Sequence, residues 1–540
     1  MIAEDIDIAL AEPGDVLHPP PIGELHRTLD WKGAFWASSG VPGGVLLTMG
    51  GIAATIGQPS WAVWIASIIM GFIQAFIYAE IAGLYPHKSG GASVYGAAAW
   101  LPYGKIIAPF SVWCNWLAWS PVLTLGTSLG AGYVMSSLFA PGATINTWHI
   151  TLLDLGFVSE GLTLRINAVS VIGTVLLLLT FALQHQGAAR AAYVQKVLGV
   201  VTLLPLIIVG LVPFITGDLP RDHLFPLLPM LRDSAGHARF GQWDAHGLTL
   251  LMGAMFGAAW STYGFETAVS YTREFKDPRR DTPRAIIASG LLCMLVFTLV
   301  PLAFQASLGL AGLLDPGIYD GSGVALALAR ILGGGAVITN VVVATLILGL
   351  LLIVMTSMMG SSRTLYQASV DGWLPRYLSR VNRHGAPSAA MWTDLLFNLV
   401  LLLASNYFAV LMISNVCYLV FNFFNLQAGW IHRLDRPHWP RPFRCPDWLL
   451  ATGSIFGFVN MVFMGCGADV WGKGTLRNGL AAVLLIVPVF LYRHYVQDNG
   501  RFPEDQAADL PIVQRAKWFS RIALLAGALI VILAHSLAST

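Results

Sequence analysis

Long apolar runs recur along the whole 540-residue chain and are separated by short polar segments. A helix of roughly 20 apolar residues crosses the ~30 Å hydrocarbon core of a bilayer. The pattern therefore predicts an all-α integral membrane protein. We expect thirteen helices, the first and sixth of them interrupted, at residues 38–57, 61–83, 107–138, 163–184, 191–215, 247–271, 284–309, 324–359, 387–404, 407–431, 448–467, 475–493 and 516–537.

The predicted spans divide the chain into four regions. Residues 1–32 contain acids and prolines without an apolar core or a cleavage site, which is typical of a disordered tail rather than a cleaved signal. Residues 33–495 hold the first twelve helices. Residues 496–515 form a polar loop, and residues 516–540 contain an additional thirteenth helix.

The distribution of positive charge predicts the orientation of the spans. The chain has 31 Lys and Arg residues, and most of them fall in alternate loops on the side of the N-terminus. Because such loops stay in the cytoplasm, we expect a cytoplasmic N-terminus and cytoplasmic loop 496–515 in the cell (inner) membrane. We also expect four tryptophans to anchor helix ends at the interface, namely Trp36, Trp61, Trp64 and Trp148.

Composition narrows the class of protein further. The chain is 56% hydrophobic and 11% charged, whereas soluble domains are about 25% charged. A net charge of +2 gives no reason to expect a nucleic-acid partner. The five cysteines are scattered without a C-x-x-C pair, so neither a disulfide framework nor a metal site is expected, and no cofactor is predicted. The sequence contains no metalloprotease motif, no paired intramembrane aspartates and no repeated filter, which argues against an enzyme or a channel.

Two predicted spans carry residues that interrupt a helix. The first span contains Ser38-Ser39-Gly40-Val41-Pro42-Gly43-Gly44-Val45, and the sixth contains Trp260-Ser261-Thr262-Tyr263-Gly264-Phe265-Glu266. The breaks lie five helices apart, and paired interrupted helices indicate the midplane site of an inverted-repeat transporter. Half-helix N-termini would offer N–H groups to an anionic ligand group such as a carboxylate. The alternative is that the glycines only allow close packing, as we expect for Gly253-x-x-x-Gly257 and Gly126-x-x-x-Gly130.

Several motifs together resemble the amino acid–polyamine–organocation (APC) superfamily. The most specific is Tyr263-Gly264-Phe265-Glu266-Thr267 followed by the basic loop 273–284, which resembles that family's helix-six signature. Pro42-Gly43-Gly44-Val45 resembles its helix-one motif, with proline in place of the first glycine. Further similar stretches are 79–95, the helix-eight exit 362–375, and 381–387. The resemblance implies a LeuT-type fold of five plus five inverted helices with two more, leaving 516–537 as an extra helix.

The resemblance also implies a set of substrate-binding residues. Backbone N–H groups of the helix-one break would bind the substrate carboxylate, Trp260 would act as a gating ring, and the helix-six break would surround the amine and side chain. Ser357 would line the site from helix eight. The implied set is Gly43, Gly44, Val45, Trp260, Ser261, Thr262, Tyr263, Gly264 and Ser357. For Trp260 the alternative is simple packing, because the chain has 18 tryptophans.

Four residues are candidates for coupling and gating. Glu266 could take up a proton as the site opens and closes, or it could cap the second half of helix six. Glu80 is expected in a cytoplasmic closing network with Arg273 or Lys276, as a rim pair weak enough to open in each cycle. Thr202 stands where some proton-coupled relatives carry a lysine, and Thr202 with Thr356 could instead bind sodium through hydroxyl oxygens.

These observations predict a secondary active transporter, a symporter or exchanger, that moves amino acids by alternating access. A polyamine or amine carrier is the first alternative, although such a site would need more acidic residues than Glu266. A transporter-like amino acid receptor is the second. The expected partners are a small-molecule amino acid, with bulky or neutral side chains favoured by the apolar lining, and the lipid bilayer. The identity of the amino acid, the coupling ion and the oligomeric state stay open.

Overall fold

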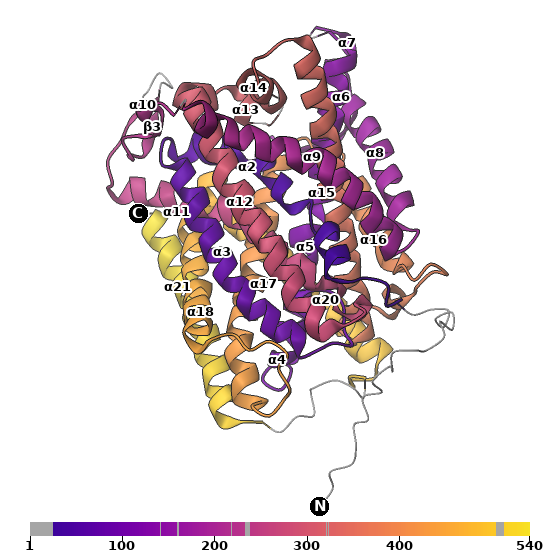
Figure 1. Cartoon of the computed structure of the whole chain (residues 1–540). Helices are drawn as coiled ribbons and strands as arrows, with labels where there is room; N and C mark the ends of the chain where they lie inside the picture. Colours follow the sequence, from indigo (N-terminus) through magenta and orange to yellow (C-terminus); the bar gives the residue numbers. More distant parts are fainter. Residues whose placement is uncertain are drawn as a thin grey trace, which may run out of the picture.

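The computed structural model describes residues 25–540 except 141, 159–160, 218, 233–237, 320, 322, 504–511 and 540. Most of the predicted tail 1–32 and the middle of loop 496–515 therefore lie outside the described residues. Within the described part the chain is mostly helical, and the helices pack into one bundle (Figure 1). Among the residues that the structure describes, nine segments are long and apolar enough to cross a membrane, so the protein is an all-α membrane protein.

The first half of the chain begins with two short helical pieces and then contributes longer helices. Its elements are α1 (Trp31–Ala37), η1 (Val41–Gly44), α2 (Val45–Ile56), α3 (Ser60–Gly83), α4 (Ala92–Trp100), α5 (Ile107–Trp119), α6 (Pro121–Leu138), α7 (Thr144–Thr147), β1 (His149–Asp154), β2 (Thr163–Asn167), α8 (Ala168–Gln184), α9 (Ala188–Thr216) and α10 (Arg221–Leu224). The strands β1 and β2 pair antiparallel outside the bundle, between α6 and α8.

The second half begins with a small antiparallel hairpin. Its elements are β3 (Met230–Arg232), β4 (Ala238–Phe240), α11 (Ala245–Thr262), η2 (Gly264–Glu274), α12 (Pro278–Leu313), α13 (Pro316–Tyr319), α14 (Val324–Ile331), α15 (Ala336–Val370), η3 (Arg376–Ser379), α16 (Ser388–Leu401), α17 (Tyr407–Asp435), α18 (Asp447–Gly467), η4 (Ala468–Trp471), α19 (Thr475–Leu484), α20 (Ile486–Leu491), the π-helical turn η5 (Tyr492–Gln497) and α21 (Gln514–Ser539).

Several predicted boundaries are wrong for physical reasons. The predicted span 163–184 begins with strand β2, whose Thr, Leu and Ile residues pair with β1 before Asn167 caps α8. The predicted span 324–359 is two helices, because Gly333, Gly334 and Gly335 all have positive φ between α14 and α15. Helix α15 then runs on to Val370, so residues 362–370 of the predicted helix-eight exit lie inside the helix and residues 371–375 follow it.

The predicted number of spanning helices is not reproduced by length and apolarity alone. The predicted span 107–138 is split at Pro121, which has no N–H to continue the ladder. Helices α8 and α16 are shorter than the predicted spans, and α11 gives way to η2 at Gly264. Both predicted interruptions are confirmed: α1 and α2 are separated by η1, and α11 changes to the 3₁₀ helix η2.

Helix α21 lies along the outer edge of the bundle, beside α18 (Figure 1). Its buried face carries small residues, and a Cβ on Gly465 of α18 would lie only 2.7 Å from Ala534. The opposite face is apolar and exposed, with Leu525 at 72% and Leu537 at 74% exposure. Small residues allow the close approach, while the larger apolar residues suit a lipid-facing surface.

A buried carboxylate joins four helical segments on one side of the bundle. Asp394 of α16 accepts hydrogen bonds from Trp116 Nε1 at 2.9 Å, from Ser361 Oγ of α15 at 2.5 Å, and from the hydroxyl of Ser120 between α5 and α6. Asn398, one turn further along α16, binds Thr124 of α6. Buried donors without acceptors are costly, so this cluster fixes how α16 packs against α5, α6 and α15.

We predict that Asp394→Leu lowers the melting temperature of the purified protein by several degrees. The substitution leaves three buried donors without their acceptor, at about 1–3 kcal/mol each before relaxation. Asp394→Asn should melt close to the parent, because its amide can accept from Trp116 and Ser120 and donate to Ser361. The control is Leu396→Ala on the exposed face of the same helix. Equal melting of Asp394→Leu and the parent would contradict a structural role for the cluster.

Candidate functional site

The first break is held against α15 by its own backbone. The N–H of Gly40 donates to Thr356 Oγ1 at 3.2 Å, and Thr356 Oγ1 donates to the Ala37 carbonyl at 2.9 Å. A Cβ on Gly40 would lie 2.6 Å from both the Leu352 carbonyl oxygen and Thr356 Oγ1. Gly40 is therefore required for close packing, as the alternative interpretation of the glycines proposed.

Gly43 and Gly44 face opposite sides of the break. Gly44 has a helical φ of −57°, a backbone conformation that any residue can adopt. Glycine matters at this position because it leaves the space beside it unfilled. A Cβ there would lie 3.8 Å from Ser261 Cβ of the second break. A Cβ on Gly43 would meet nothing nearer than the Gly349 carbonyl oxygen, at 3.8 Å. In this conformation the N–H of Gly43 donates to the Gly40 carbonyl at 3.0 Å.

The second break is surrounded by hydroxyl and amide groups of neighbouring helices. Ser261 Oγ shares a hydrogen bond with Thr48 Oγ1 of α2 at 2.8 Å. Thr262 Oγ1 shares one with Ser67 Oγ of α3 at 2.7 Å, and the Tyr263 hydroxyl donates to Asn460 Oδ1 of α18 at 3.2 Å. All these residues are buried. The structure thus brings the two sequence-predicted breaks together inside the bundle, with polar groups on both.

Aromatic rings and one carboxylate adjoin the second break. Trp260 is 2% exposed, and its ring centroid lies 6.4 Å from that of Trp119 of α5. Trp119 Nε1 donates to Glu266 Oε1 at 3.0 Å. Glu266 Oε2 is buried and has no hydrogen-bond partner among the described residues. The sequence did not single out Trp119, because nothing distinguishes it from the other tryptophans of the chain.

Gly264 allows η2 to pack closely against α5, because it has no side chain. A Cβ there would lie 2.5 Å from the Trp119 ring and 3.1 Å from Val41 of η1. Any larger residue at Gly264 would separate the second break from both the first break and Trp119. This position explains why the interruption in helix six carries glycine.

Helix α15 presents a third wall to the breaks. Ile353 Cδ1 would lie 3.9 Å from a Cβ on Gly44, and Thr267 Cγ2 of η2 would lie 3.7 Å from a Cβ on Gly360. Ser357 lies between Ile353 and Gly360 on the same helix face. Its hydroxyl is buried and has no hydrogen-bond partner within the described residues. Ser357 therefore lies on the face of α15 that adjoins the breaks, and its role in binding stays a prediction.

A glutamine joins α9 to the first break. Gln195 Nε2 donates to the Ala37 carbonyl at 3.0 Å and to Thr356 Oγ1 at 3.2 Å. No sequence signal distinguished Gln195, and the residue of this helix predicted to take part in coupling was Thr202. Thr202 lies two turns further along α9, beside Gly349, and its buried hydroxyl has no hydrogen-bond partner among the described residues.

Glu80 has other partners than the expected Arg273 or Lys276. Arg433 of α17 binds it through two contacts, of 2.9 and 2.6 Å, and Arg441 Nε lies 3.1 Å from Oε1. The side chain of Glu80 is 2% exposed, so this is a buried cluster rather than a weak rim pair. Removing one partner of a buried ion pair costs about 3–5 kcal/mol.

Two other buried ion pairs join the second break and the loop after α3 to α15. Arg363 binds Glu274, at the end of η2, through two nitrogens, with Nη2 2.9 Å from Oε2. Lys88 Nζ lies 2.8 Å from Asp371 Oδ1. Both pairs are buried, and they lie near the C-terminal ends of α15 and η2.

The expected interfacial tryptophans do not share one environment. Trp64 is 1% exposed and stacks on Phe297 of α12 at 5.6 Å, so its predicted anchoring role is wrong. It lies on the face of α3 that packs against α12. Trp148 is 44% exposed, and Trp36 and Trp61 are half-buried.

Comparison with known proteins assigns the chain to a family. A family model described as amino acid permease matches residues 29–490. The branched-chain amino acid permease BcaP of Lactococcus lactis is 25% identical over 456 residues, covering 82% of this chain and 89% of that protein. The polyamine transporter PUT1 of Oryza sativa is 24% identical, covering 76% and 67%. The L-methionine/branched-chain amino acid exporter YjeH of Escherichia coli is 28% identical, covering 47% and 50%.

The family match covers both breaks, Trp260 and the third wall on α15, and it is independent of their geometry. The chain belongs to the amino acid permease family of the APC superfamily.

Proposed function

We propose that this permease is a secondary active transporter that binds an amino acid between η1 and the α11–η2 break. The observation that carries the proposal is the pairing of the breaks: a Cβ on Gly44 would lie 3.8 Å from Ser261 Cβ, so the missing side chain of Gly44 leaves space directly beside Ser261. A carboxylate placed there would meet the N-terminal end of α2, where the helix dipole and the N–H groups of the first turn favour negative charge. Trp260 and Ser357 would cover the rest of the substrate.

The proposed architecture is a LeuT-type arrangement of two inverted five-helix units. The first unit would comprise α1/α2, α3, α5/α6, α8 and α9, and the second α11/η2, α12, α15, α16 and α17. Equivalent helices make equivalent contacts, which supports this proposal: α3 packs on α12, α6 on α8, and α15 on α16. Residues 33–495 would hold twelve helices in all, with 496–515 as a loop and 516–540 as the thirteenth helix.

We propose a neutral, apolar amino acid as substrate. The relatives named for branched-chain amino acids and methionine support this choice. A polyamine is the second candidate because PUT1 is also similar, but a second ammonium would need a carboxylate. Glu266 is the carboxylate that adjoins the second break. The other buried acids described above are already bound by cations or by several donors, namely Glu80, Glu274, Asp371 and Asp394. A second ammonium would therefore have Glu266 as its partner, which makes a polyamine the less favoured substrate.

Alternating access requires contacts that form and break on each side of the site. We propose that the protein lies in the cell (inner) membrane with its N-terminus in the cytoplasm. The ion pairs Arg363–Glu274 and Lys88–Asp371 would then close the cytoplasmic side of the site. Each pair joins α15 to a segment outside it, so separating that segment from α15 must break it. The Glu80–Arg433–Arg441 cluster joins α3 to α17 and its following loop and would move with them.

The function is tested by counterflow of labelled leucine in proteoliposomes that contain unlabelled leucine. We expect transient accumulation of label, because a carrier exchanges substrates across the membrane whereas a receptor does not. Leucine methyl ester and isoamylamine should not compete, since each lacks the carboxylate. Binding without any exchange would indicate the receptor, and equal competition by the amine would indicate an amine carrier.

We predict that Trp260→Ala weakens leucine binding by about 2 kcal/mol, roughly 30-fold, because buried aromatic rings at contact sites contribute disproportionately. Trp260→Phe should retain part of the affinity. The measurement is isothermal titration of the purified variants. The control is Trp448→Ala, a ring that is 66% exposed on α18. Parent-like binding by Trp260→Ala would show that Trp260 is core packing.

We predict that Glu266 carries the coupling proton, with sodium at Thr202 and Thr356 as the alternative. Glu266→Gln preserves an acceptor for Trp119 but cannot exchange a proton. Leucine uptake into vesicles containing a pH-sensitive dye should acidify the lumen for the parent and not for Glu266→Gln, while counterflow continues. Asp394→Asn, at a buried carboxylate that does not adjoin the breaks, is the control and should acidify normally. Acidification by Glu266→Gln would show that Glu266 does not carry the proton and only caps helix six. Uptake that requires sodium would favour a sodium site at Thr202 and Thr356.

A further inference from the structure

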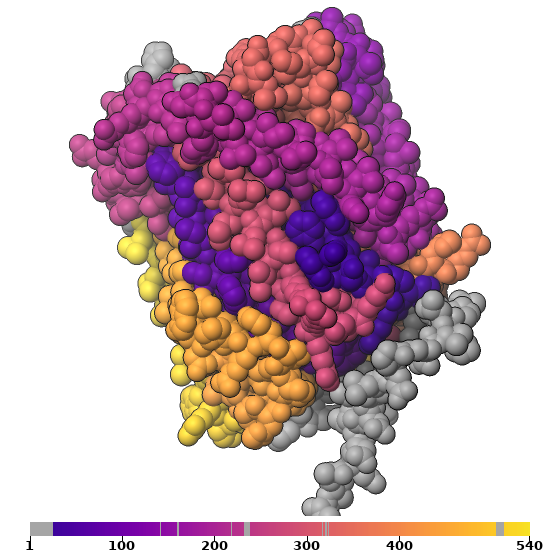
Figure 2. All heavy atoms as spheres, viewed as in Figure 1, coloured from indigo at the N-terminus to yellow at the C-terminus, as the bar shows by residue number. Residues whose placement is uncertain are grey.

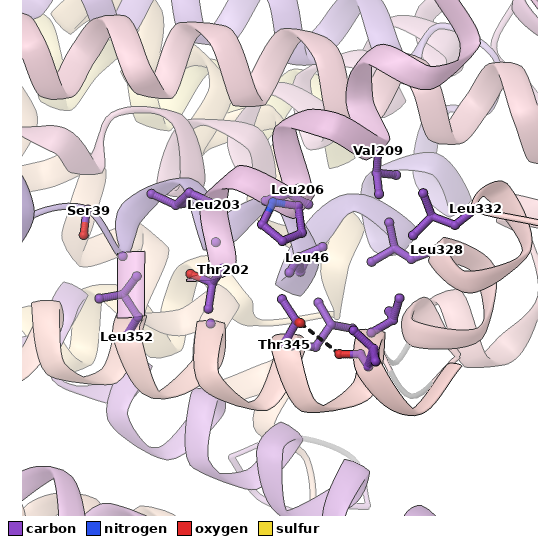
Figure 3. Close-up of a pocket in the computed structure, with 17 residues that line it drawn as sticks. Ser39, Leu46, Thr202, Leu203, Leu206, Val209, Leu328, Leu332, Thr345 and Leu352 are labelled. Carbon is purple, nitrogen blue, oxygen red and sulfur yellow. Dashed lines mark hydrogen bonds between the residues drawn. The ribbon is translucent and has the colours of Figure 1, made fainter. Parts of the chain in front are cut away.

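A pocket lies on the other side of the first break from the second break. It has a cavity volume of about 110 Å³ and is bounded by η1, α2, α9, α14 and α15. Leu46, Leu206, Leu328 and Thr345 extend into it from four of these elements (Figure 3). None of the predicted substrate-binding residues on helix six or α15 lines it, whereas Gly43 does.

The walls of the pocket offer almost nothing to a polar ligand. Apart from the backbone, its polar groups are the hydroxyls of Ser39, Thr202 and Thr345. Ser39 Oγ donates to the Trp36 carbonyl at 2.7 Å, and Thr345 Oγ1 donates to the Val341 carbonyl at 2.8 Å. A charged or strongly polar molecule would lose its hydration without compensation, so the pocket suits an apolar ligand.

The mouth of the pocket opens on a surface that faces lipid. Val341 lines the pocket and is 60% exposed. Across the mouth, α9 presents Val201, Leu204 and Ile208, which are 45%, 55% and 48% exposed. Helix α9 lies across this face of the molecule, over the interior helices (Figure 2). Both α9 and α15 are among the membrane-spanning candidates, so the molecules that reach the mouth are those of the bilayer core.

We propose that the pocket binds one acyl chain of a membrane phospholipid, and that this chain lies against Gly43 at the back of the helix-one break. Gly43 has no side chain, and its nearest neighbour on that side is the Gly349 carbonyl oxygen. The chain occupies the space into which η1 would otherwise move. Lipid in the pocket and substrate at Gly44 therefore act on opposite faces of the same short segment. The binding of the chain is independent of the proposed function, and only this coupling rests on it.

The binding is tested with proteoliposomes of phosphatidylcholine whose acyl chain carries a terminal diazirine. After irradiation, mass spectrometry locates the labelled residues. We expect label on Leu206 and Leu346, which line the pocket and are 7% and 5% exposed, in addition to the lipid-facing Leu204. Label confined to Leu204 and other outward-facing residues would show annular lipid only and would overturn the proposal.

Two matched variants on α15 separate entry from general labelling. Val341→Trp fills the mouth and should lower the label on Leu206 and Leu346 at least five-fold while Leu204 stays labelled. Val337→Trp lies one turn away, at a residue that is 78% exposed and outside the pocket, and should leave all three labels unchanged. Undiminished label on Leu346 in Val341→Trp would contradict entry through this mouth.

The coupling has its own measurement, the initial rate of leucine counterflow for the same two variants. Because η1 carries one face of the proposed substrate site, excluding the chain behind it should change the rate at least three-fold in Val341→Trp and not in Val337→Trp. Equal rates would overturn the coupling. A parent without any counterflow but with labelled Leu206 and Leu346 would refute the transport function and leave the lipid site intact.

Discussion

The structure depends on one constraint: backbone polar groups inside a bilayer must find partners within the protein. An interrupted helix exposes such groups, so it is tolerated only where the protein surrounds it. Here both interruptions are buried, and each binds neighbouring helices. Thr356 and Gln195 hold the first break, while Thr48, Ser67 and Asn460 bind residues of the second. Because Gly44 faces Ser261, and Ser261 is hydrogen-bonded to Thr48 of α2, a ligand that enters between the breaks replaces protein contacts on both sides at once.

Charged side chains inside the bundle must likewise find partners within the protein. The buried ion pairs of Lys88 and Glu80 join different segments away from the breaks, and the pair of Glu274 joins the far end of η2 to α15. Each stabilises one arrangement of the bundle, because separating a buried pair costs several kcal/mol. Glu266 differs from them, since it adjoins the second break and lacks a cationic partner among the described residues. Asp394 is held by three donors and belongs to the packing of α16.

The sequence predicted the parts of this arrangement that local chemistry determines. Pro42, Gly43, Gly44 and Gly264 indicated the breaks because clustered proline and glycine disfavour a regular helix. The spans themselves followed from apolar length, although Gly333–Gly335 should have divided the eighth one. Contacts between distant segments could not be predicted in this way. Glu80 meets Arg433 across 353 positions, and Trp119 reaches Glu266 across 147, with no local signal at either partner. Trp64 was misassigned because an apolar ring suits an interface and a core equally.

The most direct test of the account is a structure of the purified protein in lipid nanodiscs with saturating leucine. We predict density for the ligand between η1 and the α11–η2 break, with its carboxylate at the N–H groups near Gly44 and its side chain against Trp260 and Ser357. The pocket between α9 and α15 should then hold a separate, elongated density. Leucine in that pocket, or anywhere other than between the two breaks, would contradict the central claim that the paired breaks form the substrate site.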